Sequence, residues 1–228
     1  MDSSSASSNS NQEMIIPHLL PLEKNRETIN KDIFTNLVKM LIERGLINKE
    51  RRDEIIEVLA SSMLNDLIFK IKLDNYKHIY GENNDTMIIK IVNHKITSLS
   101  KSSGFHDILT TYNTFPKILI VQDISLKTRF QIKTDKSYNF LEIFLEKELL
   151  INIIDHVSQP KFTLLSEEEA TLVLQAYHAN RRDLPKMSVM DAIARYYNAS
   201  HGQLMRIIRP SETSGLAVSY RLIINSLI

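Results

Sequence analysis

The sequence predicts an α/β domain followed by a small α+β domain with a mixed sheet. Three observations support this fold class: two nearly continuous apolar runs separated by a helical pattern, two capped helix starts in the C-terminal third, and a final segment in which apolar and polar side chains alternate. Strands buried on both faces are continuously apolar, whereas a strand with one buried face alternates. A chain of 228 residues can hold two such domains.

Residues 1–25 are predicted to form a disordered tail, because serine, asparagine and glutamine supply too little apolar surface to offset the entropy of ordering. A helix follows, and Arg44 and Gly45 mark its expected end. A second helix is predicted from about Asn48. Both helices carry an apolar stripe that we expect in the core: Ile33, Phe34, Leu37, Val38, Leu41 and Ile42 in the first, and Ile55, Ile56, Leu59 and Met63 in the second.

The α/β pattern comes next. Residues 87–92 and 118–121 are predicted buried strands, and the spacing of apolar side chains predicts a helix between them, from Phe105, Ile108, Leu109 and Tyr112. Strand, helix and strand in this order predict a βαβ unit. Residues 149–154 are predicted to form a further strand, and we place the domain boundary there: 26–148 for the α/β domain and 149–228 for the C-terminal domain.

Capping residues define the C-terminal helices. Ser166 with Glu169 predicts a capping box, and the inner face of this helix is expected to hold Leu172, Val173, Ala176 and Tyr177. Ser188 and Asp191 repeat the pattern for a short helix through Tyr197, and Asn198 suits a left-handed residue after it.

Two strands are predicted to close the chain. Residues 203–209 form the first, residues 210–215 a turn, and the last strand follows. Gly215 is expected to have a positive φ. One face of the last strand is fully apolar, so we expect that face to pack on a core: Leu216, Val218, Tyr220, Leu222 and Ile224.

Composition limits the function classes. The absence of cysteine excludes disulfides, thiolate zinc sites and a cysteine nucleophile. The N-terminus lacks the apolar core of a secretory signal, and no run approaches the ~18–20 apolar residues of a membrane span. Five glycines leave no phosphate-binding loop. We therefore expect no cofactor, no membrane partner and no small-molecule substrate.

A free-standing nucleic-acid-binding or nuclease-like protein is the alternative function. Metal-dependent nucleases need clustered carboxylates, commonly with an acidic residue two positions before a lysine. That triplet is absent, Asp107, Asp123 and Glu142 are scattered, and His156 has no neighbouring ligand at metal spacing beyond Asp155. The formal net charge of +1 also argues against a protein that binds many phosphates by itself. We expect no catalytic residue and no metal site.

Three stretches of the C-terminal third, in order and spacing, resemble a known family. They are Leu149-Leu150-Ile151-Asn152-Ile153 with Pro160-Lys161; Leu165-Ser166 with Glu169 and Leu184-Pro185; and Asp191-Ala192-Ile193-Ala194-Arg195-Tyr196 with Arg206-Ile207-Ile208-Arg209-Pro210-Ser211-Glu212-Thr213-Ser214-Gly215 and Ser219-Tyr220-Arg221. Together they resemble the shared assembly subunit of archaeal and eukaryotic DNA-directed RNA polymerases, which in eukaryotes is the fifth-largest subunit.

The resemblance implies a non-catalytic structural subunit of a transcription enzyme. Its C-terminal assembly domain would dock on the largest polymerase subunit beside other subunits, and its α/β domain would be a jaw that extends towards downstream duplex DNA. Such a subunit works in the nucleus with the transcription machinery or, for a viral polymerase, in the virion and the host-cell cytoplasm.

The sequence also departs from the family pattern. Asp191-Ala192 replaces the usual Asp-Pro, Phe162 replaces a second histidine, and Ser125 to Thr128 replaces a Pro-Ser-Ala loop. The chain is therefore a divergent member, and a large DNA virus that encodes its own polymerase is our hypothesis for its source.

Candidate contact residues follow from the motif. We expect the subunit-docking surface to include Arg206, Arg209, Ser211, Glu212, Thr213, Gly215, Tyr220 and Arg221. An arginine and a carboxylate can pair across an interface, although Glu212 can equally satisfy turn amides or pair within its own domain. Lys127 and Arg129 are expected in a flexible loop, either touching DNA phosphates weakly and without sequence preference or simply solvated.

Overall fold

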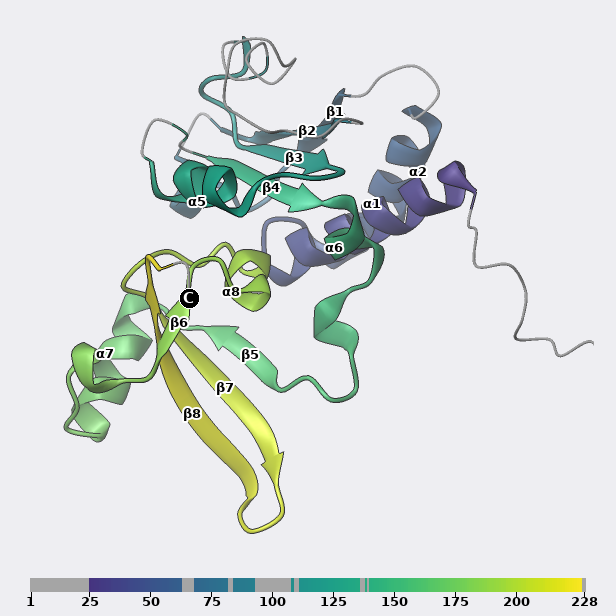
Figure 1. Ribbon diagram of the computed structural model, residues 1–228. Coiled ribbons are helices and arrows are strands. Elements are labelled where there is room, and N and C mark those ends of the chain that lie inside the picture. Colours follow the sequence, from purple (N-terminus) through teal and green to yellow (C-terminus); the bar gives the residue numbers. More distant parts are fainter. Residues whose placement is uncertain are drawn as a thin grey trace, which may run out of the picture.

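A computed structural model describes residues 25–62, 68–81, 84–92, 108, 111–135, 138 and 140–226. The predicted tail lies outside these residues, except for Asn25. The chain builds two four-stranded sheets (Figure 1). The elements of the first half are α1 (Arg26–Glu43), η2 (Lys49–Arg51), α2 (Arg52–Ser62), β1 (Ile68–Lys72), α3 (Lys77–Tyr80), β2 (Thr86–Val92), β3 (Lys117–Val121), α5 (Leu126–Thr134), β4 (Leu141–Leu145) and α6 (Glu146–Leu150). Those of the second half are η4 (Ile153–Asp155), β5 (Lys161–Leu164), α7 (Glu167–Ala176), η5 (Arg181–Asp183), β6 (Lys186–Ser188), α8 (Ala192–Tyr196), β7 (Leu204–Ser211) and β8 (Gly215–Ile224).

The N-terminal sheet has the order β1-β2-β3-β4, with β1 antiparallel to β2 and the other pairs parallel. Helices α1 and α2 cover one face, where Ile33, Phe34 and Leu37 pack against Ile89 and Ile118. The other face packs Leu119 and Val121 against Ile108 and Ile132. The two predicted strands and the α/β class are confirmed. Of the helix predicted between them, Phe105 and Leu109 lie outside the described residues, while Ile108 is helical and buried.

Both predicted N-terminal helices are present. The stripe of α1 is buried except for Ile42, which packs at the edge of the core. The helix ends at Glu43 with Arg44 as its C-cap, and Gly45 has the positive φ of +74° that a C-terminal glycine provides. Asn48 precedes η2 and α2, and Met63 lies outside the described residues.

Helix α5 corrects the expectation of a loop at residues 125–129. Ser125 caps it, because its side chain accepts a hydrogen bond from the Thr128 amide at 3.1 Å. The helix connects the parallel strands β3 and β4 and so forms a βαβ crossover. Lys127 and Arg129 therefore lie in a helix rather than in a flexible loop.

The predicted strand at residues 149–154 is wrong. Leu149 and Leu150 end α6, and Ile153 and Ile154 lie in η4. Leu149 and Leu150 pack into the core of the N-terminal sheet, and Ile153 packs against the core of the C-terminal sheet. Helix α6 spans the predicted domain boundary between residues 148 and 149, and that boundary stays a prediction.

The C-terminal sheet has the order β5-β7-β8-β6 and is mixed, because β6 is parallel to β8 whereas the other pairs are antiparallel. The capping box of Ser166 and Glu169 is confirmed at α7, and Asn198 has the expected positive φ, +50°. The inner face of α7 was predicted correctly for Val173, which packs against the core beside the buried Ala170, and wrongly for Leu172, Ala176 and Tyr177, which are exposed. Asp191 caps α8, while Ser188 ends β6.

Strands β7 and β8 form a longer hairpin than expected. Strand β7 extends to Ser211, which leaves only residues 212–214 in the turn. The prediction that the whole apolar face of β8 packs on a core is wrong for its outer half. Leu222 is buried, but Leu216 and Val218 are 66% and 48% exposed. Among the described helices, none is long and apolar enough to cross a membrane.

Candidate subunit interface

The outer part of the β7–β8 hairpin stands alone. β7 and β8 pair from Leu204↔Leu222 to Ser211↔Gly215, whereas β5 reaches only Ile208 and β6 reaches only Leu222. Beyond these points the sheet is a two-stranded ribbon that projects from the rest of the molecule (Figure 1). An isolated ribbon of this kind is marginally stable unless something packs against it.

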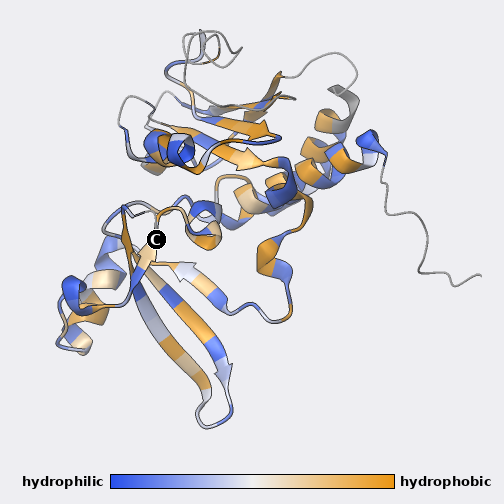
Figure 2. Cartoon of the chain, viewed as in Figure 1, coloured by the Kyte–Doolittle hydropathy of each residue, from blue (hydrophilic) through white to orange (hydrophobic). Residues whose placement is uncertain are grey.

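One face of this ribbon is apolar. Val218 lies opposite Ile208 and Leu216 opposite Pro210, so their side chains share one face. Towards the base of the hairpin the same face reaches Tyr220, whose ring lies 5.7 Å from that of Tyr177 on α7. Apolar bands along the hairpin are visible in Figure 2. Adjacent exposed apolar side chains such as Leu216 and Val218 are typical of an interaction site.

The predicted docking residues are spread over the hairpin. Arg206 is half-buried in β7, and its Nε is buried with no hydrogen-bond partner in the described part of the chain. Arg209 and Arg221 are exposed. Arg209 and Arg221 lie on the face opposite Val218, whereas Arg206, which lies opposite Tyr220, shares the face of Val218.

The turn is held by Ser211 rather than by Glu212. The Ser211 hydroxyl accepts from the Ser214 amide at 3.4 Å and lies 3.3 Å from the Thr213 hydroxyl. Gly215 has a φ of +70°, as predicted. Glu212 is exposed. The alternative in which Glu212 satisfies turn amides is therefore not the arrangement observed.

The two basic residues predicted near DNA have different environments. Lys127 is exposed in the first turn of α5. Arg129 is buried, and its Nη1 and Nη2 donate to the two carboxylate oxygens of Glu148 at 2.9 and 3.2 Å. Arg129 is thus occupied by an internal ion pair, which local sequence patterns do not reveal because its partner lies 19 positions away.

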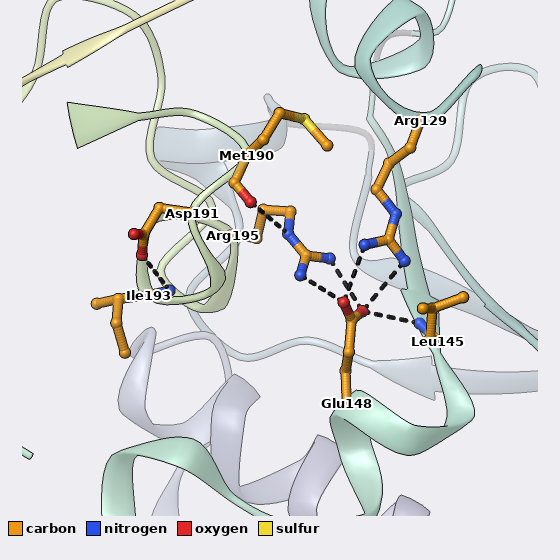
Figure 3. Close-up of polar contacts among 7 residues, drawn as sticks. All are labelled: Arg129, Leu145, Glu148, Met190, Asp191, Ile193 and Arg195. Atoms are coloured by element: carbon orange, nitrogen blue, oxygen red, sulfur yellow. Dashed lines mark hydrogen bonds and ion pairs between the residues drawn. The ribbon is translucent and has the colours of Figure 1, made fainter. Parts of the chain in front are cut away.

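Glu148 is the centre of a charge cluster between the two sheets (Figure 3). Arg195 of α8 also donates to both carboxylate oxygens of Glu148, at 2.6 and 3.0 Å, and the Leu145 amide donates at 2.9 Å. Burial acts to raise the pKa of Glu148, but the hydrogen bonds and charges of Arg195 and Arg129 outweigh it and lower the pKa to about 2. The cluster joins α5, α6 and α8.

A second charged contact lies beside it. Arg44 pairs with Glu142 at 2.7 and 2.9 Å and also donates to the carbonyl oxygens of Arg195 and Tyr196 at 2.9 and 2.7 Å. Burial acts to lower the pKa of Arg44, but Glu142 outweighs this effect and raises it. A buried bidentate ion pair fixes the relative orientation of the two side chains and also contributes to stability. These contacts hold α8 against the N-terminal sheet.

Scattered carboxylates do not meet in the described residues. No group of three or more His, Asp, Glu or Cys side chains that could hold a metal ion is found among them. Glu142 and Glu148 each form an ion pair with an arginine.

Sequence comparison relates the chain to known proteins. A family model described as RNA polymerase Rpb5, C-terminal domain, matches residues 151–223, which include the whole of β7 and nearly all of β8. Over 206 residues the chain is 32% identical to DNA-directed RNA polymerase subunit 5 of Acanthamoeba polyphaga mimivirus, covering 90% of this chain and 97% of the viral protein. The chain belongs to the RNA polymerase subunit 5 family.

Cellular members of the subunit 5 family are also similar. A subunit of DNA-directed RNA polymerases I, II and III from Dictyostelium discoideum is 45% identical over 82 residues, which are 36% of this chain and 42% of that protein. Subunit 5B of polymerases IV and V from Arabidopsis thaliana is 28% identical over 176 residues, which are 69% and 80% of the two chains. The resemblance inferred from the sequence is confirmed, and the viral match supports a viral source.

Proposed function

We propose that this subunit docks on the largest subunit of a multi-subunit RNA polymerase through its C-terminal domain. The observation that carries the proposal is the apolar face of the projecting hairpin, which lies within the segment that matches the family model. In the isolated chain Leu216 and Val218 are exposed to water, and docking on a partner surface would bury them.

Charged residues would orient that contact. Arg209 and Arg221 are exposed on the face opposite Val218, and Glu212 is exposed in the turn, so a partner that encloses the hairpin would meet these charges at the edge of the contact. Arg206 adds a partly buried guanidinium whose Nε lacks an acceptor in the described part of the chain. The partner surface should therefore combine an apolar centre with acidic groups at its edge.

The N-terminal domain would act as the jaw that extends towards downstream DNA. Lys127 is the exposed residue that supports this part of the proposal, whereas Arg129 is used internally. In reconstituted polymerase, Lys127→Ala should weaken the binding of downstream duplex DNA. It should also reduce the slope of log binding constant against log salt concentration by about 1. An unchanged salt dependence would remove Lys127 from the DNA path.

The subunit itself would be non-catalytic and would act wherever the assembled polymerase transcribes. Support comes from the ion pairs that Glu142 and Glu148 form with arginines, and from the fact that no cluster of three or more possible metal ligands is found among the described residues. The purified subunit with Mg²⁺ or Mn²⁺ should not cleave DNA. Cleavage that a single carboxylate substitution abolishes would favour the nuclease-like alternative instead.

Docking is tested by removing the apolar face. Leu216→Ser should weaken co-purification with the largest subunit, because it deletes exposed apolar area that docking would bury. Leu126→Ser is the matched control, since Leu126 is 58% exposed but lies on α5, away from the hairpin. Both variants should melt like the wild type. Equal binding by both variants would contradict docking through this face.

A further inference from the structure

The outer edge of β8 differs from that of β7 in its backbone groups. Pro210 has no amide hydrogen, and it stands in β7 just beyond the point where β5 ends. A proline at this place blunts the free edge of β7 against further pairing. Strand β8 carries no proline or lysine between Gly215 and Arg221, so its free edge is unprotected.

Hydrogen bonds at the base of the hairpin fix which amides of β8 face that edge. The Leu222 amide donates to Pro185 on the β6 side at 2.8 Å, while the Ile223 amide donates to Gln203 on the β7 side at 2.9 Å. Backbone groups of successive residues in a strand point to opposite sides. The amide and carbonyl of Val218 and Tyr220 therefore point away from β7, like those of Leu222.

No strand of the described chain pairs with β8 on this side before Leu222. The open edge runs from Gly215 to Arg221, about 20 Å at ~3.3 Å per residue, which is long enough for a five-residue strand. Val218 and Tyr220 thus offer their peptide groups at the spacing that an added strand requires, beside an apolar face that is already exposed.

We propose that an extended segment of another polymerase subunit adds to this edge as a fifth strand, next to β8. The inference rests on the proposed docking function and specifies its form. Side chains of the added strand alternate: those beside Leu216, Val218 and Tyr220 are apolar, and those on the other face lie beside Ala217, Ser219 and the guanidinium of Arg221, where an acidic residue fits. Main-chain hydrogen bonds supply affinity, and the alternation supplies specificity.

Two substitutions at one position separate the backbone from the side chain. Val218→Pro removes the outward N–H, whereas Val218→Ala keeps the N–H and removes two methyl groups of the side chain. Because the Val218 amide does not pair with β7, the hairpin should tolerate proline there as it tolerates Pro210. In co-purification with the remaining polymerase subunits, Val218→Pro should bind about tenfold or more weakly than Val218→Ala, since a hydrogen bond is lost and the ring obstructs the edge.

Amide hydrogen exchange of the wild-type chain gives a measurement that needs no variant. In the free chain the Val218 and Tyr220 amides should exchange fast and those of Ala217 and Ser219 slowly, and assembly should slow the first two. Equal binding by Val218→Pro and Val218→Ala, with fast exchange of both amides after assembly, would overturn strand addition. Docking would still stand in that case if Leu216→Ser weakens binding. If the Val218 and Tyr220 amides already exchange slowly in the free protein because it dimerises, the edge pairs with a second copy and the inference is overturned.

Discussion

Strands β3 and β8 are both rich in apolar residues, but the fold uses them differently. All five residues of β3 are buried, including Lys117, whose ammonium group donates to the carbonyl oxygens of Asn113 and Phe115 at 3.1 and 2.8 Å. Of the ten residues of β8, only Leu222 and Ile223 are buried. The strand β3 of the N-terminal sheet is fully covered, whereas the strand β8 of the C-terminal sheet leaves apolar side chains exposed.

Charges follow the same division. At the junction, Arg44, Arg129 and Arg195 each pair with a carboxylate of the same chain. On the hairpin, Arg209, Glu212 and Arg221 stay exposed. The paired charges hold elements of the same chain together, whereas exposed charges beside apolar surface are what the proposed docking site requires. Four predictions test this division, beginning with the largest expected effect.

Arg44→Met should cost about 3–5 kcal/mol of stability, because it leaves the partly buried Glu142 carboxylate and two backbone carbonyls without their donor. Urea unfolding at neutral pH measures the loss. Arg209→Met on the hairpin is the control and should change stability by less than about 0.5 kcal/mol. Similar losses for the two variants would erase the distinction between junction and hairpin.

Ile118→Ala in β3 should cost about 2–5 kcal/mol, since it opens a cavity in a fully buried strand. Val218→Ala at the hairpin should stay within about 0.5 kcal/mol, because that side chain is about half exposed. Thermal melts of the two variants beside the wild type give the comparison. A costly Val218→Ala would mean that the tip face contributes to the intramolecular fold after all.

Acid should weaken the junction before it affects the hairpin. The pKa of Glu148 is lowered to about 2 from its ordinary value near 4.5, so its ionised form stabilises the fold fully above pH 4.5. This contribution is lost as the pH falls from about 4.5 towards 2. Glu148→Gln should therefore be less stable than the wild type at pH 7, and the difference should shrink between pH 4.5 and pH 2. A constant difference across that range would exclude Glu148 as the titrating group.

Sequence patterns predicted the elements that depend on local apolar spacing. Helix α1 and strands β2 and β3 have regular apolar patterns, α1 ends before Gly45 as predicted, and Asn198 and Gly215 have the predicted positive φ. Helix α5 was missed because Ile132 is its only buried hydrophobic residue, although Ser125 was an available capping signal. The short apolar run at 149–154 is compatible with either strand or helix, and periodicity alone cannot separate them.

Site contacts were harder to predict for two physical reasons. Glu148 and Arg195 are 47 positions apart, so only the folded chain brings them together. Alternation in β8 predicted which side chains share a face, but it carries no information on what covers that face. Leu216 and Val218 were consequently assigned to a core when half of that face is exposed.

Glu212→Lys is expected to have the smallest effect on stability and so tests the hairpin most sharply. One exposed turn charge is worth less than about 1 kcal/mol to the fold, and Ser211 rather than Glu212 holds the turn. Association with the largest subunit should weaken by more than that, because reversing a charge in a paired, partly desolvated contact costs several kcal/mol. Glu57→Lys on α2, also exposed, controls for the change in net charge. A pull-down with the largest subunit and a thermal melt are measured for each variant. If Glu212→Lys binds and melts like the wild type, Glu212 is an ordinary surface residue. If both binding and thermal stability are lost, Glu212 is a structural residue of the turn.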